Sequence, residues 1–521
     1  MTLSRSLRAV PSKKALSWSG PFRGRMEMHM ERSSGVLLHI SSLPSRLGIG
    51  TMGAAAFAFV DFLERAGQKY WQVLPIHPTG FGDSPYQSFS THAGNPYFID
   101  MELLCGQGLL QISECESLDW GSDPENVDFA LIYENKYRIL RQAYGRGFNA
   151  QDGAFLQFCE ENRHWLVDYA VFMAAKQTNE MRPWHEWENL PLQFHEQDAI
   201  RAFIEQNQEE VLFYQYIQFL FYAQWNNLKQ YANSRGVRII GDIPIYVAAD
   251  SADAWANRGM FYLDQKNECE IVAGCPPDFF SEEGQYWGNP VYNWEYLKET
   301  RYDWWMDRLA SMQKLYDVVR IDHFRGFESY YAIDAEAHSA RFGNWRKGPG
   351  MDFFNEVYKR LPSLSIIAED LGYLTEAVYD LLEETGYPGM KVLQFAFESD
   401  SANEYLPHHY PKNCVVYTGT HDNTTVAGWL EESPKDMAFA KEYAALTGEE
   451  GYNWGMIRLA HASVANLAVI PMQDYLNLPS WARMNQPATL GENWRWRLRP
   501  EYAPEELIQR IRKMTEVYGR L

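Results

Sequence analysis

Residues 317–328 read DVVRIDHFRGFE, a pattern typical of a short buried strand that ends in charged residues. Side chains alternate across a strand, so Arg320 and Asp322 should share one face, with Asp322 at the strand end. A carboxylate flanked by Arg320 and Arg325 is expected to stay ionised at neutral pH, because nearby cations lower its pKa. An ionised carboxylate at a strand end is a plausible nucleophile. A structural arginine–aspartate pair is the alternative.

Seven other segments have the apolar runs of strands, and helical segments separate most of the eight. The predicted strands are 35–39, 71–76, 237–247, 317–322, 365–370, 390–397, 414–422 and 467–476. Strands that alternate with helices indicate a parallel sheet, and eight such units predict an α/β fold of the (β/α)8 TIM barrel type. An open doubly wound sheet is the alternative, but no GxGxxG or GxxxxGK motif follows any of these strands.

Two large insertions separate the predicted barrel strands. Residues 100–236 read as mostly helical, because apolar residues recur there with helical periodicity. Residues 248–300 are rich in Gly, Pro, Asn and aromatic residues, which is typical of loops over an active site. The catalytic barrel, with both insertions, is predicted to span residues 30–521.

Residues 1–29 differ from the rest of the chain. The first 25 residues carry six Arg or Lys, five Ser and no acidic residue, as transit peptides do. A translated upstream region is the other interpretation, because Met26, Met28 and Met30 each offer an internal start. Both interpretations predict a disordered extension. The expected location is the cytoplasm, or a plastid if the extension is a transit peptide.

The composition narrows the class of partner. The 521 residues are 46% hydrophobic and 15% aromatic, with a formal net charge of −21 that disfavours nucleic acid and anionic membranes. The most apolar helical run, 211–225, is too short and too polar to span a membrane. Six cysteines without a CxxC pair fit a reducing compartment and show no zinc-site spacing. The aromatic excess suits stacking on sugars, although aromatic residues also fill ordinary cores.

Three predicted strands end in an acidic residue: Asp322, Glu369 and Asp422. The carboxyl ends of barrel strands meet at one rim, so these side chains are expected to form one site. One interpretation is a divalent metal site. The other is retaining glycoside chemistry, with a nucleophile and a protonated acid about 5 Å apart, and the aromatic loops favour it. Apolar residues before Glu369 are expected to raise its pKa and suit it to the acid role, although a solvated strand end or a helix cap is the alternative.

Several motifs, in order along the chain, resemble those of one enzyme family. They are DSPYQSFSTHAGNPY, GDIPIYV, PPDFFSEEGQYWGNPVYNW, VVRIDHFRGFE, IAEDLG, TGTHDNTT and ARMNQPAT. The chain is thereby similar, over about residues 33–498, to the 4-α-glucanotransferases called amylomaltase or disproportionating enzyme, glycoside hydrolase family 77. The resemblance implies an enzyme that transfers segments of maltodextrins and other α-1,4-glucans, with glucose or maltodextrin as acceptor. It implies neither a cofactor nor a metal.

The resemblance also implies roles for the residues that match the motifs. In a retaining double displacement, Asp322 would be the nucleophile, Glu369 the acid/base, and Asp422 the residue that holds sugar hydroxyls in the distorted transition state. The implied substrate-binding residues are Ser84, Tyr86, Asp242, Asp278, Gln285, Trp287, Arg320, His323, His421 and Asn485. Those in 278–287 match a mobile loop over the acceptor side. Packing aromatics at 86 and 287, and a strand-end histidine at 421, are the alternatives.

Two rival functions remain open from the sequence. A plain α-glucan hydrolase would keep all three carboxylates, and release of reducing sugar without an added acceptor would distinguish it. A non-catalytic glucan-binding protein would bind sugar without turnover, and the intact carboxylates argue against it.

Overall fold

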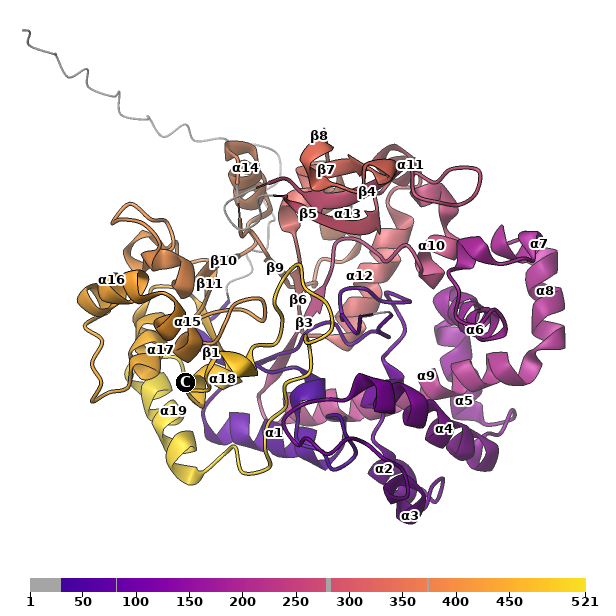
Figure 1. Ribbon diagram of the computed structural model, residues 1–521, viewed down its shortest axis with the longest axis horizontal. Helices are drawn as coiled ribbons and strands as arrows, with labels where there is room; N and C mark the ends of the chain where they lie inside the picture. The colour runs from indigo at the N-terminus through magenta and orange to yellow at the C-terminus, as the bar shows by residue number, and fades with distance from the viewer. Residues whose placement is uncertain (1–29, 81, 278–282, 373) are drawn as a thin grey trace, which may run out of the picture.

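The computed structural model describes residues 30–80, 82–277, 283–372 and 374–521 (Figure 1). The predicted extension 1–29 and one predicted substrate-binding residue, Asp278, lie outside these ranges. Within the described ranges, no helix combines the length and the apolar character that crossing a membrane requires.

Eight parallel strands form one sheet, in the order β10-β11-β12-β1-β2-β3-β6-β9. Their bounds are β1 Ser33–Leu37, β2 Tyr70–Gln72, β3 Arg238–Ile243, β6 Val318–Ile321, β9 Ile366–Ala368, β10 Gly389–Val392, β11 Cys414–Tyr417 and β12 Leu467–Pro471. The first and last strands of this order also meet, because the amide of Ala368 donates to the carbonyl of Pro388, next to β10, at 3.0 Å. The sheet is therefore the (β/α)8 barrel predicted from the sequence.

All eight predicted barrel strands are present, but most are shorter than the predicted ranges. The clearest case is β3, which ends at Ile243 because Pro244 has no amide hydrogen to continue the ladder. The last predicted strand, 467–476, likewise ends at Pro471, and the helix α18, Met472–Tyr475, follows at once. The barrel strands are almost wholly buried, as expected for strands covered by helices outside and packed side chains inside.

Helices cover the outside of the barrel (Figure 1). Those that follow barrel strands are α1 Ala54–Arg65, α12 Asp303–Leu315, α13 Met351–Arg360, α14 Glu376–Thr385, α15 Val426–Glu432, α16 Pro434–Ala444, α17 Tyr452–Ala462 and α19 Glu505–Val517. The C-terminal helix α19 packs against α1, near the start of the described chain, and against α17, near its end.

A helical layer lies to one side of the barrel, at the right of Figure 1. Its helices are α2 Met101–Gly106, α3 Ile112–Glu116, α4 Phe129–Gly147, α5 Gly153–Glu161, α6 Arg163–Thr178, α7 Leu190–Gln193, α8 Gln197–Gln206 and α9 Gln208–Ser234. Two buried amides of α9 tie this layer to the loop after β2. The side-chain amide of Gln218 accepts from the backbone amide of Gly94 at 2.7 Å and donates to its carbonyl at 2.9 Å. The side-chain amide of Gln224 makes the same two bonds with the backbone of Asp100, at 2.6 and 3.1 Å.

A second sheet of four antiparallel strands has the order β5-β4-β7-β8. Its strands are β4 Ile271–Cys275, β5 Gln285–Pro290, β7 Ser329–Asp334 and β8 Asn344–Lys347. The sequence analysis read residues 248–300 as loops and placed no strand at β7 or β8. A register shift between Val272 and Gly274 interrupts the alternation by which such short strands are recognised.

Candidate active site

The backbone places two of the predicted carboxylates at the same rim of the barrel. Asp322 directly follows β6, and its amide donates to the carbonyl of Ile243 in β3 at 2.9 Å. Glu369 directly follows β9, and its amide donates to the carbonyl of Ile321 in β6 at 3.0 Å. The strand ladder thus continues one residue beyond each strand, so both side chains start from fixed backbone positions at the carboxyl ends of adjacent strands.

A buried arginine holds the base of the site. Arg320 and Asp242 are cross-strand partners in β6 and β3, and Nη1 of Arg320 lies 2.7 and 2.6 Å from the two carboxylate oxygens of Asp242. Its Nη2 lies 3.0 Å from Oδ1 of Asp322. The hydroxyl of Tyr86 donates to Oδ2 of Asp242 at 2.8 Å, and the Tyr86 ring stacks on His421 with centroids 5.2 Å apart. These predicted residues therefore form one connected network, from β3 through β6 to the loop after β11.

Burial raises the pKa of Asp322 well above its ordinary value. Arg320 opposes this rise, whereas the neighbouring carboxylates of Glu369, Asp242 and Asp422 add to it. The sequence analysis expected the pKa to be lowered, and that expectation was wrong. A sequence shows the adjacent arginines but neither the burial nor the carboxylates that converge from other strands.

The second flanking arginine has a different position from the one expected. Arg325 lies over the ring of Trp345, with the guanidinium carbon 3.9 Å from the ring centre, and also donates to the hydroxyl of Ser329. Of the two arginines, it is Arg320 that forms the ion pair with Asp322.

The carboxylate of Glu369 accepts two backbone hydrogen bonds. Oε2 accepts from the amide of His323 at 2.7 Å, and Oε1 accepts from the amide of Leu371 at 2.8 Å. Burial raises the pKa of Glu369, and these two bonds and Arg320 limit the rise. The direction agrees with that expected from the apolar residues that precede it.

Asp422 is held by a loop that is distant in sequence. The side-chain amide of Asn485 donates to its Oδ1 at 2.6 Å, and the backbone amide of Asn485 donates to the carbonyl of His421 at 3.0 Å. Arg483 donates through Nη2 to the carbonyl of Asp422 at 2.5 Å and through Nε to the carbonyl of Asn485 at 2.6 Å. The sequence analysis quoted the motif that contains Arg483 without assigning it a role, because its partner lies 61 positions away.

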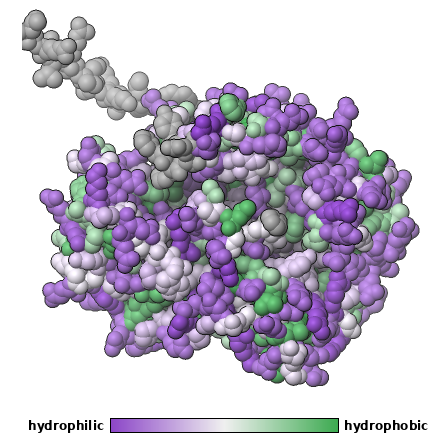
Figure 2. All heavy atoms as spheres, viewed as in Figure 1, coloured by the Kyte–Doolittle hydropathy of each residue, from purple (hydrophilic) through white to green (hydrophobic). Residues whose placement is uncertain are grey.

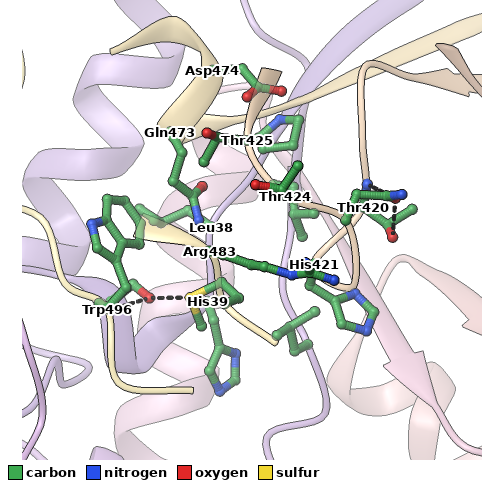
Figure 3. A pocket seen from close by; sticks show the side chains of 16 residues that line it. Leu38, His39, Thr420, His421, Thr424, Thr425, Gln473, Asp474, Arg483 and Trp496 are labelled. Carbon is green, nitrogen blue, oxygen red and sulfur yellow. Dashed lines mark hydrogen bonds between the residues drawn. The ribbon is translucent and has the colours of Figure 1, made fainter. Parts of the chain in front are cut away.

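A pocket lies beside Asp422, between the ends of β1, β11 and β12 (Figure 3). The Arg483 side chain runs across it toward His421. His39, at the end of β1, lines the same pocket, and burial lowers the pKa of His39 to about 3. This imidazole is therefore neutral, and Arg483 supplies the positive charge beside the pocket.

Of the remaining predicted residues, His323 and Gln285 both contact Trp287. The ring of Trp287 stands perpendicular to that of His323, with centroids 4.8 Å apart, and its Nε1 donates to Oε1 of Gln285 at 3.0 Å. His323 has a left-handed backbone (φ 52°), which is rare outside sites where the surroundings enforce it. Burial lowers the pKa of His323 to about 3, so it is neutral. Ser84 lies before Tyr86 in a turn and accepts the Tyr86 amide at 3.3 Å.

Among the residues described by the structure, no three or more His, Cys, Asp and Glu side chains are arranged to hold a metal ion. The chemistry that this rim offers is that of half-buried carboxylates, the guanidiniums of Arg320 and Arg483, and neutral imidazoles.

Comparison with known proteins identifies the family. The family model described as 4-alpha-glucanotransferase matches residues 38–503. The 4-alpha-glucanotransferase of Clostridium butyricum is 49% identical, over 93% of this chain and 100% of its own length. That of Thermus thermophilus is 45% identical, over 95% and 100%. The solved amylomaltase of Streptococcus agalactiae, in complex with acarbose, has a TM-score of 0.92 at 41% identity and covers 94% of this chain and 100% of its own. The chain therefore belongs to the 4-alpha-glucanotransferases of glycoside hydrolase family 77.

Proposed function

We propose that this protein is a 4-alpha-glucanotransferase that moves α-1,4-glucan segments between maltodextrin donors and glucose or maltodextrin acceptors. The observation that carries the proposal is the pair of half-buried carboxylates, Asp322 and Glu369, at the ends of adjacent barrel strands, with Arg320 bound to Asp322. Family membership and the acarbose complex of the Streptococcus agalactiae amylomaltase support α-1,4-glucans as the substrate class.

In the first step, an oxygen of Asp322 attacks the anomeric carbon of the donor, and the bond from that carbon to the glycosidic oxygen breaks. Glu369 gives its proton to the departing oxygen, so the leaving chain departs as an alcohol. This step needs one ionised and one protonated carboxyl. Burial raises the pKa of both carboxyls, so the pKa shifts alone do not separate the two roles. The direct contact with Arg320, at 3.0 Å, favours Asp322 as the ionised member and leaves the proton on Glu369.

In the second step, Glu369 accepts the proton of an acceptor 4-hydroxyl, whose oxygen attacks the anomeric carbon. The ester bond to Asp322 breaks and its carboxylate is regenerated. Two displacements at one carbon retain its configuration, so an α-linkage gives an α-linkage. Asp422 is assigned to bind the hydroxyls of the sugar between the two carboxyls, and its bonds to Asn485 and Arg483 support this assignment.

Transfer outcompetes hydrolysis only if an acceptor sugar displaces water. Trp287 faces His323 at the rim, where an indole ring can stack on an acceptor and exclude water from the reacting carbon. Tyr86, Asp242 and His421, joined by hydrogen bonding and stacking, are assigned to the donor sugar. No metal or cofactor takes part in this scheme.

We infer a cytoplasmic location, because six cysteines in 521 residues without a CxxC pair fit a reducing compartment. A relative from Arabidopsis thaliana at 40% identity is named chloroplastic/amyloplastic, so a plastid is the alternative. Fractionation of the source cells followed by immunoblotting distinguishes the two.

Incubation with maltotriose alone tests the activity. Transfer should yield glucose together with maltodextrins longer than maltotriose, while the total number of reducing ends stays constant. Rising reducing ends without longer products would identify a hydrolase, and unchanged maltotriose would identify a binding protein.

A further inference from the structure

The small antiparallel sheet has two different faces. One face packs on the barrel, where Ala273, Tyr330 and Ala332 belong to the main hydrophobic core. The other face has a separate small core, made by Val272, Tyr331, Ile333 and Ala340. The sheet is thus packed on both faces. Side chains that lie outside the small core are exposed to solvent on a sheet that these two cores hold in place.

The solvent side of this small core displays aromatic rings. Tyr286, Gly274, Tyr331 and Trp345 are directly opposite one another across the four strands, so their side chains share one face. Tyr286 and Trp345, on the two edge strands, are 39% and 42% exposed. Three strand spacings of about 4.8 Å separate these edge strands by about 14 Å.

A third exposed ring, that of Phe342, belongs to the turn that Tyr331 holds. The hydroxyl of Tyr331 donates to the carbonyl of Ala340 at 3.0 Å, and Phe342, two residues further on, is 72% exposed. A benzyl side chain this exposed contributes little to folding, because it keeps most of its apolar surface in water. The four-stranded sheet and the turn that contains Phe342 are together called the lobe. Three such exposed rings on this lobe form the kind of surface that marks a binding site.

Two of the three rings are already fixed in orientation. Trp345 is covered on one side by the guanidinium of Arg325, 3.9 Å from its centre, and meets the Tyr331 ring edge-on at 5.3 Å. The hydroxyl of Tyr286 donates to the carbonyl of Ala335 at 3.3 Å. A ligand that stacks on rings held in this way loses less conformational entropy than one that must order them.

The surroundings of the rings offer hydrogen-bond donors to a hydroxyl-rich ligand. Arg341 is exposed in the turn, where it forms an ion pair with Glu283, and Lys347 is exposed on the same face of β8 as Trp345. On these two segments the exposed large hydrophobic residues are aromatic, without an exposed Leu, Ile or Met. Flat rings among hydrogen-bonding groups match a sugar chain, which presents apolar C–H faces and hydroxyl edges.

The lobe is continuous with the proposed active site. Tyr286 and Trp287 are neighbours in β5, so their side chains point to opposite faces of the sheet. Trp287 faces His323 at the catalytic rim, and Tyr286 belongs to the outer row. A glucan chain that leaves the rim over the edge strand β5 therefore meets the outer rings next.

We propose that Tyr286, Phe342 and Trp345 form a second glucan-binding surface, which holds a distant part of a long α-1,4-glucan while one end reacts at the rim. The inference rests on the proposed function for its ligand. It extends that function, because it assigns a preference for long chains to residues outside the catalytic rim.

The test compares long and short substrates in a double variant, Trp345→Ala with Phe342→Ala. Matched controls are Tyr133→Ala and Tyr296→Ala, since these rings are 50% and 42% exposed on α4 and on α11, Trp294–Glu299. In native gels that contain soluble amylose, the double variant should bind about fivefold more weakly than wild type, which corresponds to about 1 kcal/mol. Its kcat/KM should fall by a similar factor on amylose, through KM, and stay at the wild-type value on maltotriose. The controls should behave as wild type.

If amylose slowed the double variant in the gel as much as it slows wild type, the proposal would be overturned. Equal losses of kcat/KM on amylose and maltotriose would also overturn it, because the rings would then act in the catalytic rim or in folding. A changed oligomeric state in size-exclusion chromatography, with unchanged retardation, would make the lobe a protein interface instead. Phe342→Ser alone, at the most exposed of the rings, repeats the test if the double variant melts early. Failure of the proposed transferase function can be distinguished from failure of the glucan-binding proposal. In that case wild type would not form maltodextrins longer than maltotriose, while the gel assay would still report binding of amylose.

Discussion

The two ends of the barrel each bury an arginine, but the partners of these two arginines differ in charge. At the carboxyl end, Arg320 is 3% exposed and binds the carboxylates of Asp242 and Asp322. At the opposite end, Arg520 is fully buried and donates to backbone carbonyls, including that of Ser33 at 2.8 Å. The other carbonyls that it reaches are those of Ala460, His461, Ser463, Ala465 and Asn466.

The partners determine what each charge does. Burial lowers the pKa of Arg520 to about 9, because carbonyl dipoles compensate its charge less than carboxylates would. The pKa of Arg320 is instead raised well above its ordinary value, because the carboxylates outweigh the effect of burial. One arginine therefore opposes the pKa rise of Asp322, the proposed nucleophile, and the other ties the starts of β1 and β12 to the end of the chain. Changes at the carboxyl end should alter turnover, and changes at the opposite end should alter stability.

The largest effect on turnover is expected at Asp322, the proposed nucleophile. Asp322→Asn keeps the size of the side chain and removes the nucleophile, so maltotriose transfer should fall about 10⁴-fold or more. Its melting temperature should stay near that of wild type. Initial rates and thermal melts measure both quantities. A variant that keeps more than about a tenth of the rate, a loss below ~1.4 kcal/mol, would show that Asp322 is not the nucleophile.

The second effect separates the two carboxyls by their roles. Glu369→Gln lacks the acid, so its rate on maltodextrins should fall about 10³-fold. An α-glucosyl fluoride needs little protonation to leave, so the first step should survive with this substrate. The second step still lacks its base, and a glucosyl ester on Asp322 should accumulate and be detected by mass spectrometry. Equal losses on both substrates without an adduct would leave Glu369 with a structural role only.

A smaller effect is expected where an arginine acts through another residue. Arg483→Met removes the bonds that fix Asp422 and Asn485, and a misplacement of about 1 Å can reduce the rate by about 100-fold. The matched control is Arg495→Met, because Nε of Arg495 donates to the carbonyl of Val127 at 3.0 Å, a bond away from the carboxylates.

The Arg483 variant should lose kcat more than affinity for maltodextrin, and Arg483→Lys should recover part of the loss. Kinetics at several maltotriose concentrations, beside melting curves for all three variants, separate a positioning role from a structural one. Equal losses in the variants at 483 and 495 would mean that the loop needs both arginines merely to fold.

The sequence was informative where a local pattern decides the structure. Most barrel strands contain an apolar run of a few residues, and Asp322 and Glu369 directly follow such strands, so strand ends and candidate carboxylates could be predicted together. Asp242 and Arg320 were assigned by resemblance, and the structure joins them as cross-strand partners.

What the sequence could not give depends on contacts between distant residues. Arg520 meets Ser33 across 487 positions, and Arg483 meets Asp422 across 61. Neither arginine differs locally from a surface arginine. The direction of the pKa shift of Asp322 was missed for the same reason, since burial and converging carboxylates exist only after folding.

At the opposite end of the barrel, the expected effect is on stability alone. Arg520→Met leaves several buried carbonyls without a donor and should lower the free energy of unfolding by about 3 kcal/mol. The kcat of the folded variant at 25 °C should match that of wild type, as urea melts and initial rates would show. A tenfold loss of kcat at unchanged stability would mean that the two ends of the barrel are not independent.

The smallest effect is expected from two truncations that differ by three residues. A protein that starts at Met30 keeps Arg32, which donates to the carbonyls of Tyr518 (2.9 Å), Ser463 (2.9 Å) and His461 (2.8 Å). Removal of the basic, Ser-rich residues 1–29 should then leave both kcat and melting temperature unchanged.

A protein that starts at Ser33 loses Arg32 and also Met30, which is buried in the main hydrophobic core. It should lose about 1 kcal/mol of stability, because partly buried carbonyls lose a charged donor while Arg520 still reaches two of them. Its kcat should stay at the wild-type value, because Arg32 lies at the end of the barrel away from the carboxylates. Melting curves of the two truncated proteins beside the full chain provide the measurement. A lower melting temperature already in the protein that starts at Met30 would show that residues 1–29 contribute to stability. These residues would then have to be counted with Arg32 and Arg520 at the stabilising end of the barrel.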